Sequence, residues 1–396
     1  TLAQTDLIRR RWLDNHFVGV IYGLNYQYNS RLKFTLGGAA NRYAGAHFGE
    51  LIWAQFASNS QIYDRYYDND ALKSEVSSYL KTNYQKNGLD LTLDLQYRGI
   101  AYQFLGVDQV SGVLTDVTQN VNYHFFNPKM SIAKNMGAHN LFGSFGIANR
   151  EPVRRDFRES TPTNRPLSER MFDTEFAYRF EKDKLNIQTN LFLMYYQNQL
   201  VLTGQINDVG GYTRTNVDKS YRTGLEMEFA YQFLSKLRFQ AATSLSQNKV
   251  LNFVEFVDVY LDDAPYYTQI QIAHGTTDLA FSPNFIQTLG LQYAPLERLT
   301  LSLQSKYVSR QFLDNTSDVK RSLDPFTFTN FSCNYQVKQK FARSFELGFL
   351  VNNLFNALYA NNGYTFSYMY GGQTTTQNFY YPQAGRHFLL KMSIQF

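Results

Sequence analysis

Residues that could carry out chemistry are sparse in this chain. Six histidines and one cysteine, Cys333, are scattered, and no two histidines stand at the spacing of metal ligands. Asp258, Asp262 and Asp263 could offer oxygens to calcium, but they lack the glycine and the regular spacing of a calcium loop, so a solvated acidic loop is the better interpretation. Phosphate-binding loops, nucleophile elbows and HExxH motifs are absent from the sequence. We therefore expect no enzyme activity, no metal site and no cofactor.

Aromatic side chains crowd two long segments and could form binding surfaces. Aromatic rings offer a large contact area at a low entropic cost, so rings on outer loops could close over a ligand. The competing interpretation is an aromatic girdle at a membrane surface, or packing within each loop. The candidate ligand contacts in these segments are Trp53, Tyr63, Tyr66, Tyr67, Tyr260, Tyr266 and Tyr267.

Three arginines begin another long segment. Arg150, Arg154 and Arg155 could attract an anionic ligand such as a ferric chelate, because guanidinium groups bind anions through several donors. The competing interpretation is that they form ion pairs with the nearby acids, which are Glu151, Asp156 and Glu159.

The elements that must position these residues are β-strands. Leu89, Leu91, Leu93, Leu95 and Tyr97 alternate with polar residues at a period of two, which is typical of a strand with one apolar face. The same pattern recurs and predicts about fifteen strands, many of about ten residues, which is the length that crosses a bilayer at a tilt. Their approximate starts are Phe17, Leu32, Val76, Leu89, Asn122, Asn140, Glu169, Leu185, Leu225, Leu237, Phe285, Leu299, Phe326, Phe345 and His387.

Composition narrows the class. The chain of 396 residues is 44% hydrophobic and 16% aromatic, which excludes a disordered chain. Its mean hydropathy of −0.39 and the lack of a long apolar run exclude a helical membrane protein but not a membrane barrel, in which only alternate residues are apolar. The net charge of +5 is dispersed, so nucleic-acid binding is not expected.

The connections alternate in length. Tight turns, such as Asn29-Ser30, Lys86-Asn87-Gly88 and one near Lys340, alternate with long segments. Short periplasmic turns and long extracellular loops are typical of outer-membrane barrels, whereas soluble sandwiches have no reason to sort connections in this way. We therefore predict an all-β, transmembrane antiparallel β-barrel in an outer membrane, contacting lipid. Its last strand ends at the periplasmic side with Phe396. The long segments are 45–75, 106–119, 150–168, 203–219, 250–283, 312–324 and 357–386.

Polar residues on the other strand face should line a hydrated interior. There they would dock a plug domain or set the selectivity of a pore. The candidates are Asp90, Asp94, Arg98, Glu226, Glu228, Lys306 and Lys391.

The strand count raises a question of parity. Bacterial single-chain barrels have an even number of strands, and fifteen becomes even if Thr5 to Trp12 forms one more strand before a turn at Asp14-Asn15. That reading gives a passive porin of about sixteen strands. The alternative is that preceding strands are missing and that residues 1–396 are part of a larger barrel.

Several segments resemble the C-terminal part of TonB-dependent outer-membrane receptors, particularly those of Bacteroidetes. Each motif is weak alone, but their order and spacing are specific, and the similarity covers most of the chain. The segments are Asn41–Gly49, Phe126–Lys129 leading into Ile147–Asp156, Asn216–Glu226, Val351–Asn356 and Tyr380–Arg386.

The resemblance implies a barrel of about 22 strands that is plugged by an N-terminal domain. Such a receptor imports a scarce nutrient of the siderophore, haem, cobalamin or glycan class, using energy passed on by TonB from the inner membrane of a Gram-negative bacterium. The plug, the TonB-contacting segment and the first strands are not found in this sequence. We therefore expect residues 1–396 to be a partial barrel without a separate soluble domain, whose partners are membrane lipid, the missing plug, the TonB complex and a small ligand.

Overall fold

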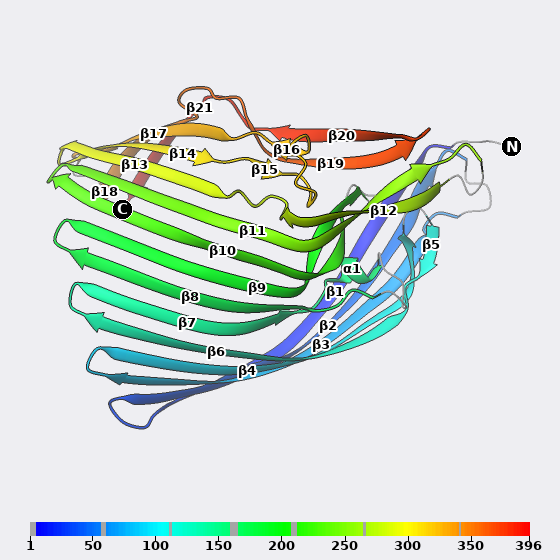
Figure 1. Cartoon of the computed structure of the whole chain (residues 1–396), viewed down its shortest axis with the longest axis horizontal. Coiled ribbons are helices and arrows are strands. Elements are labelled where there is room, and N and C mark those ends of the chain that lie inside the picture. Colours follow the sequence, from blue (N-terminus) through cyan, green and yellow to red (C-terminus); the bar gives the residue numbers. More distant parts are fainter. Residues whose placement is uncertain are drawn as a thin grey trace. The chain divides into compact units, whose positions relative to one another are not determined.

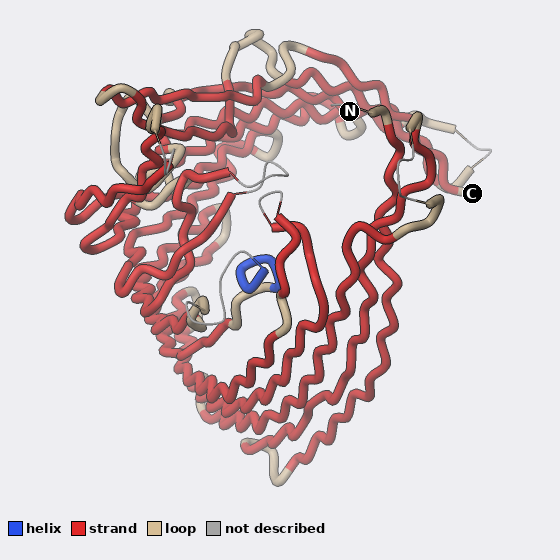
Figure 2. Tube along the Cα trace, turned by 90° about the vertical axis from the view of Figure 1, so that its right-hand side faces the viewer, coloured by secondary structure: helices blue, strands red, loops and turns tan. Residues whose placement is uncertain are grey.

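A computed structural model describes residues 5–56, 61–110, 113–158, 165–206, 212–263, 267–339 and 342–396. The chain forms two compact units, of which unit 1 comprises Thr1–Ser131, Gly146–Met171 and Ile206–Asn216, and unit 2 comprises the remainder. Nearly all described elements are strands (Figure 1). The one helix of the described part is α1 (Arg154–Arg158), which Figure 2 shows in blue. No helix in the described part of the chain is long and apolar enough to cross a membrane.

Unit 1 is built on four long strands. Each pairs antiparallel with the next along almost its whole length, in the order β1–β2–β3–β4. The strands of this unit are β1 (Leu7–Gln27), β2 (Leu32–Ala54), β3 (Arg65–Lys86), β4 (Leu89–Val110) and the short β5 (Val113–Asp116). Five strands have residues in both units: β6 (Gln119–Met136), β7 (His139–Arg150), β8 (Glu169–Lys182), β9 (Leu185–Ile206) and β10 (Tyr212–Leu234).

Unit 2 continues with antiparallel hairpins. β11 pairs with β10, then with β13 near its start and with β12 near its end, and the later strands pair in the order β13–β14–β17–β18–β21. The short turns of the β10–β11 and β13–β14 hairpins lie at one end of the strands, and the last residues of β11 and the β19–β20 turn lie at the other (Figure 1). The strands are β11 (Leu237–Tyr260), β12 (Tyr267–Asp278), β13 (Phe285–Leu296), β14 (Leu299–Val308), β15 (Gln311–Phe312), β16 (Ser322–Leu323), β17 (Phe326–Gln336), β18 (Ser344–Asn352), β19 (Ala360–Tyr370), β20 (Gln373–Pro382) and β21 (His387–Gln395).

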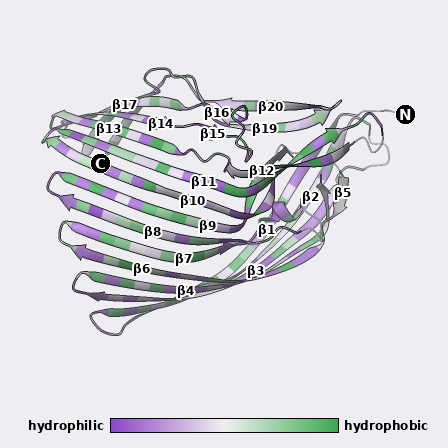
Figure 3. Ribbon diagram, in the orientation of Figure 1, coloured by the Kyte–Doolittle hydropathy of each residue, from purple (hydrophilic) through white to green (hydrophobic). Residues whose placement is uncertain are grey.

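The register fixes the two faces of the sheet. In β4 the side chains of Leu91, Leu93 and Tyr97 are exposed, whereas Asp90 and Asp94 on the other face are partly covered. Leu91 and Leu95 stand opposite Tyr84 and Leu80 of β3, so the apolar residues of neighbouring strands share one face. Hydrophilic and hydrophobic residues alternate along the strands in Figure 3. An exposed apolar face on a sheet of this size suits contact with lipid.

All fifteen predicted strands are present, but the structure has six more, which are β5, β12, β15, β16, β19 and β20. Five of the seven predicted long loops are in fact mostly strand, namely 45–75, 106–119, 203–219, 250–283 and 357–386. Segment 45–75 contains the end of β2 and the start of β3, and segment 357–386 contains the β19–β20 hairpin. Beyond a bilayer both faces meet water, so the apolar alternation fades although the backbone ladder continues. The sequence pattern therefore marks only the lipid-contacting part of each strand.

The additional strand proposed for Thr5 to Trp12 is wrong. Leu7 to Gln27 forms one continuous strand, and Asp14 and Asn15 pair in the ladder with Ala46 and Gly45 of β2 instead of turning. Backbone pairing with β2 on both sides of this position outweighs the turn preference of an Asp-Asn pair.

The predicted tight turns are confirmed where they are described, and the one near Lys340 lies outside the described residues. The β3–β4 turn consists of Asn87 and Gly88, whose φ angles are 50° and 72°. Both positive φ values belong to the turn type that suits the twist of a two-residue hairpin, and asparagine and glycine tolerate them best.

Replacing Gly88 with Val should destabilise the folded chain by about 1–2 kcal/mol, because a side chain is strained in the left-handed region. Urea-induced unfolding in lipid vesicles would measure this loss. Ser235→Val is the matched control, because Ser235 lies in the β10–β11 turn and is not among the residues with positive φ. An equal effect of both substitutions would contradict the explanation.

Candidate binding site

A basic pocket lies within unit 1. Its volume is about 470 Å³, and five of its lining side chains are cationic while one is a carboxylate. The residues that line it are Lys73, Arg98, Tyr102, Arg150, Glu151, Pro152, Val153, Arg154 and Arg214.

Strand alternation brings the first of these side chains together. Lys73 of β3 stands opposite Tyr102 of β4, and Arg98 lies four residues before Tyr102 on the same strand. Residues two or four apart share a face, so Arg98 and Tyr102 project on the side opposite to Leu91 and Leu93. The pocket therefore opens on the polar face of the sheet.

Glu151, directly after β7, is shared by two cations. Its Oε1 lies 2.8 Å from Nζ of Lys73 and 3.2 Å from Nη2 of Arg98. Arg98 also donates to Glu75, with Nε 2.8 Å from Oε1. Burial alone would raise the pKa of Glu151, but the hydrogen bond from Lys73 and the charges of Lys73 and Arg98 together hold it below the ordinary value. Glu151 is therefore ionised at neutral pH.

Helix α1 contributes Arg154 to the pocket and is firmly anchored. The side chain of Phe157 is 1% exposed and packs against Ala71, Tyr102 and Phe104. Asp156 accepts hydrogen bonds from the backbone N–H of Val153 at 2.8 Å and from the guanidinium of Arg214 at 2.6 and 3.0 Å.

Arg154, the first residue of α1, reaches towards the strands. It donates a hydrogen bond to Asn69, and its Nη2 lies 3.8 Å from Oδ2 of Asp108. Its Nε is buried and has no hydrogen-bond partner among the described residues. One donor of Arg154 is therefore left unused by this part of the protein.

Glu151→Gln should lower the free energy of unfolding by about 1–3 kcal/mol at neutral pH, because hydrogen bonds to a charged group are lost. The folded-state pKa of Glu151 is depressed, so its contribution is fully present above the ordinary glutamate pKa of about 4.3 and is lost as pH falls through the lower folded-state pKa. Urea unfolding of wild type and variant should thus differ at pH 6–7 and converge below about pH 4. Glu181→Gln, at an exposed pair with Arg179, is the control with little effect at any pH. A difference that persists at acid pH would contradict this reasoning.

The structure brings Arg150 and Arg154 together with Arg98 at the pocket, but Arg155 is not among the lining residues. Among the described residues the ion pairs of these two arginines have partners other than Glu151 and Asp156. Arg150 pairs with Glu169 at 2.8 Å, and Arg154 approaches Asp108 at 3.8 Å. Glu159 lies outside the described residues.

Of the candidate aromatics in unit 1, Tyr66 and Tyr67 contact each other edge to face, with ring centroids 5.1 Å apart. Arg9 lies over the ring of Tyr66 and Arg10 over the ring of Tyr63, at 5.2 and 5.7 Å. Trp53 is exposed near the end of β2. Their contact with a ligand stays a prediction.

The other aromatic group is partly described. In unit 2, Tyr260 at the end of β11 packs edge to face on Tyr368 of β19, with ring centroids 5.8 Å apart. Tyr266 lies outside the described residues, and Tyr267 begins β12 opposite Tyr260. Asp262, once considered for calcium, accepts a hydrogen bond from the Tyr370 hydroxyl at 2.7 Å.

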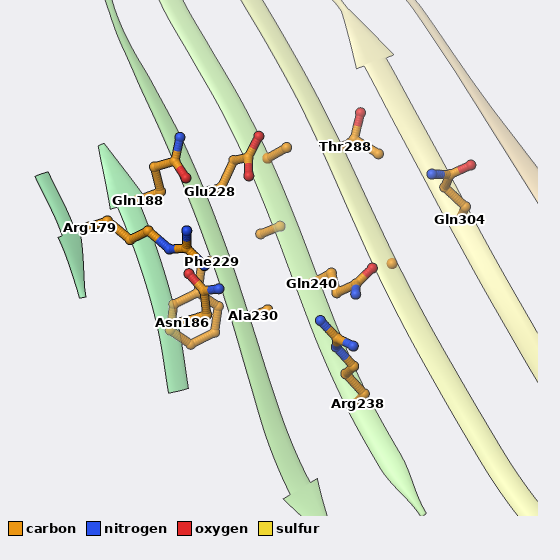
Figure 4. A pocket seen from close by; sticks show the side chains of 13 residues that line it. Arg179, Asn186, Gln188, Glu228, Phe229, Ala230, Arg238, Gln240, Thr288 and Gln304 are labelled. Carbon is orange, nitrogen blue, oxygen red and sulfur yellow. The ribbon is translucent and has the colours of Figure 1, made fainter. Parts of the chain in front are cut away.

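Interior candidates lie on the polar face of unit 2. Glu228 lines a depression of about 480 Å³ together with Arg179 and Arg238, and Figure 4 shows these side chains projecting from neighbouring strands. Glu226 lines a second depression with Arg179. Lys306 stands opposite Thr288, which lines the first depression, and Lys391 of β21 stands opposite Gly348 of β18. In unit 1, Asp90 accepts a hydrogen bond from Gln85 at 2.6 Å.

Sequence reasoning missed Lys73, Glu75 and Arg214. The strand near Val76 showed weak alternation, so Lys73 and Glu75 were not assigned to a face. Both lie an even number of residues before Ser77, which stands opposite Arg98, so strand alternation would have placed them on the polar face with Arg98.

The chain matches the family TonB dependent receptor-like, beta-barrel, over residues 3–354. It belongs to this family, and its fold is an all-β, transmembrane antiparallel β-barrel. The family comprises transporters and receptors and is not an enzyme family. Its members are outer-membrane proteins of Gram-negative bacteria that interact with TonB and with small ligands.

Solved structures agree on the fold. The chain is similar to a structure described as copper transporter OprC, with a TM-score of 0.74, 15% identity and coverage of 97% of this chain and 57% of that one. The siderophore receptor PiuA from Acinetobacter baumannii matches with a TM-score of 0.70 and 14% identity, over 96% of this chain and 56% of that one. The ferric citrate transporter FecA matches with a TM-score of 0.67 and 18% identity, over 97% of this chain and 54% of that one. The chain thus spans little more than half the length of these proteins.

Proposed function

We propose that this chain is the barrel part of an energised importer in the outer membrane of a Gram-negative bacterium, and that its basic pocket binds a small anionic metal chelate. The family membership supports transport. The charge of the basic pocket is the observation from which we infer an anionic ligand. A plug domain and the TonB complex would act through parts of the protein beyond these residues, and the Bacteroidetes type stays a prediction.

The chemistry of the pocket suits an anion better than a neutral ligand. Arg98, Arg150, Arg154 and Arg214 are charged at any physiological pH and offer several fixed N–H donors each. Their acidic partners leave part of this donor capacity unused, as at Arg154. A volume of about 470 Å³ lies within the usual range for small-molecule sites. Two of the similar structures are named as a siderophore receptor and a ferric citrate transporter, which agrees with a metal chelate as the ligand.

A passive porin of about sixteen strands is less well supported. That reading required Thr5 to Trp12 to form a separate strand, ideally pairing with the last one. Leu7 to Trp12 instead pair with Ala54 to Phe48 of β2.

Titration of the purified complete protein with ferric citrate, a ferric catecholate, cyanocobalamin and maltoheptaose would test the ligand class. We expect micromolar or tighter binding of at least one ferric chelate, with Kd rising at least about tenfold between 50 and 500 mM salt because the attraction is ionic. Binding of the vitamin or sugar alone would overturn this ligand class.

Uptake by cells would test the energised mechanism separately. Uptake of the bound chelate should disappear in cells that lack TonB. Uptake that continues at the same rate would favour the porin.

A further inference from the structure

The connection between β14 and β17 in unit 2 is buried, although connections usually run over the surface. We call residues 311–323, which contain β15 and β16, the docked loop. Leu313 and Leu323 are 2% and 1% exposed, and Asp314, Asn315 and Arg321 are also buried. A segment packed this tightly must be held on more than one side.

The docked loop lies on the polar face of the sheet. In the first part of β11, Phe239 and Leu245 share the apolar face with Leu291 and Phe285 of β13. The opposite face begins with Arg238 and Gln240 and leads to Asn248 and Val250. A bulge at Asn252, with φ of 52°, shifts the alternation by one residue, so the face continues with Phe253, Glu255 and Val257. These residues are buried, and the docked loop contacts Glu255.

Hydrogen bonds attach the loop to the end of β12. The Ser317 hydroxyl accepts from the backbone N–H of Asp278 at 2.7 Å and donates to the Asp278 carboxylate at 3.1 Å. Asn315 Oδ1 accepts from the N–H of Ala280 at 2.8 Å. Backbone N–H groups at and just after the end of β12 thus donate hydrogen bonds to side chains of the docked loop.

A buried ion cluster holds the loop to β11. Arg321 Nη1 donates to Glu255 and also lies 3.1 Å from Oδ2 of Asp314. Glu255 Oε2 in turn lies 2.7 Å from Nε2 of His274 on β12. The guanidinium of Arg321 therefore links the two ends of the docked loop through Asp314 and attaches the loop to β11 through Glu255. Because these side chains are buried, removing Arg321 would leave the carboxylates of Glu255 and Asp314 without their shared cation.

The β19–β20 hairpin covers the other side of the loop. Asn378 donates to the Lys320 carbonyl at 2.8 Å, and a Cβ added at Gly363 would lie 3.2 Å from Leu313. The tip of β19 pairs in parallel with β11, so that Tyr370 stands opposite Tyr260. The loop is thus enclosed between β11–β12 and β19–β20.

We propose that the docked loop is a fixed ledge that narrows the barrel interior on its outer side and limits the size of solutes that can enter, and that Arg321 is the positioning residue that holds it. In a membrane barrel the polar face lines the interior, which places the ledge in the path of a solute. A segment held on two sides does not act as a lid that closes over a ligand.

Hydrogen–deuterium exchange on the purified complete protein tests the docking. Amides of residues 313–323 should exchange at least about a hundredfold more slowly than an unstructured peptide, and Arg321→Met should accelerate them at least about tenfold while residues 237–245 stay unchanged. Lys320→Met is the matched control, because Lys320 lies in the same loop, has an exposed side chain and contacts Asp318 and Asn378 through its backbone. Fast exchange in the wild type, or identical behaviour of the two variants, would overturn the proposal.

If Arg321→Met does not assemble, Glu255→Gln replaces it, because the amide keeps the size of the side chain and removes one charge. An assembled Glu255→Gln protein should exchange at least about threefold faster in residues 313–323. Unchanged exchange would count against the ion cluster as the anchor.

Cell permeability tests the size limit. Cells producing the complete protein with Arg321→Met should become at least about fourfold more susceptible to an antibiotic that is linked to the imported ferric chelate and is too bulky for the wild type, whereas Lys320→Met cells should not. Faster exchange without increased susceptibility would refute the role in size selection. Ligand binding at the basic pocket is measured independently, so failure of either proposal can be recognised.

Discussion

Leu93→Arg should prevent the chain from assembling into a membrane, whereas Thr92→Arg should leave assembly intact. Leu93 is exposed on the apolar face of β4, four residues from the β3–β4 turn, which places it near the middle of the bilayer. An arginine at this depth on the lipid face costs about 2–4 kcal/mol, which is a large fraction of the stability of a folded protein. Thr92 lies on the polar face between Asp90 and Asp94, where a cation has partners.

Folding of the two variants of the complete protein into lipid vesicles, followed by gel mobility without heating and by protease resistance, would measure assembly. We expect the folded fraction of Leu93→Arg to fall at least about tenfold at equal lipid concentration. Thr92→Arg also loses the hydrogen bond that Asn83 donates to Thr92 at 2.7 Å, so a loss of about 1 kcal/mol is expected there. Equal assembly of both variants would mean that the apolar face of β4 does not meet lipid.

The positions of the strands could be predicted because alternation is a local signal. The alternation from Leu89 to Tyr97 is enough to predict a strand and its two faces, and the pair Asn87-Gly88 is enough to predict the turn before it. The lengths could not be predicted. The outer half of β2, from Asn41 to Ala54, has little alternation, and its conformation depends on pairing with β1 and β3 on either side. The short strands β15 and β16 depend even more on the surrounding contacts.

The candidate site could be predicted only in part, for the same reason. Arg150 and Arg154 attracted attention because they are close in sequence. Lys73 and Arg214 reach the same pocket from positions 77 residues before and 64 residues after Arg150, through register that no local pattern reveals. The buried cluster of Arg321 and Glu255 joins residues 66 apart in the same way.

The two charged clusters differ in their surroundings. At Arg321 the guanidinium lies within 4 Å of the carboxylates of Glu255, Asp314 and Asp318 and is enclosed by protein, so it acts within the fold and holds the loop. At the basic pocket five cations line an open volume that only one carboxylate shares. The first arrangement fits a structural anchor, and the second fits a site that receives charge from outside.

Arg154→Gln should therefore weaken the binding of an anionic ferric chelate about 10- to 100-fold, because a charge-assisted hydrogen bond contributes about 1.5–3 kcal/mol. Arg155→Gln is the matched control, since Arg155 is the next residue of α1, carries the same charge and is not among the pocket-lining residues. Titration calorimetry on the complete protein would give Kd for both variants.

The comparison separates a specific contact from a general electrostatic effect. Both substitutions remove one positive charge from the same short helix, so a pure field effect would weaken binding equally and would vanish at high salt. A direct contact of Arg154 would leave a difference between the variants at 500 mM salt. Helix α1 should keep its position in both, because Phe157 and the Asp156–Arg214 pair anchor it independently. Equal affinities of the two variants at every salt concentration would exclude Arg154 as a ligand contact.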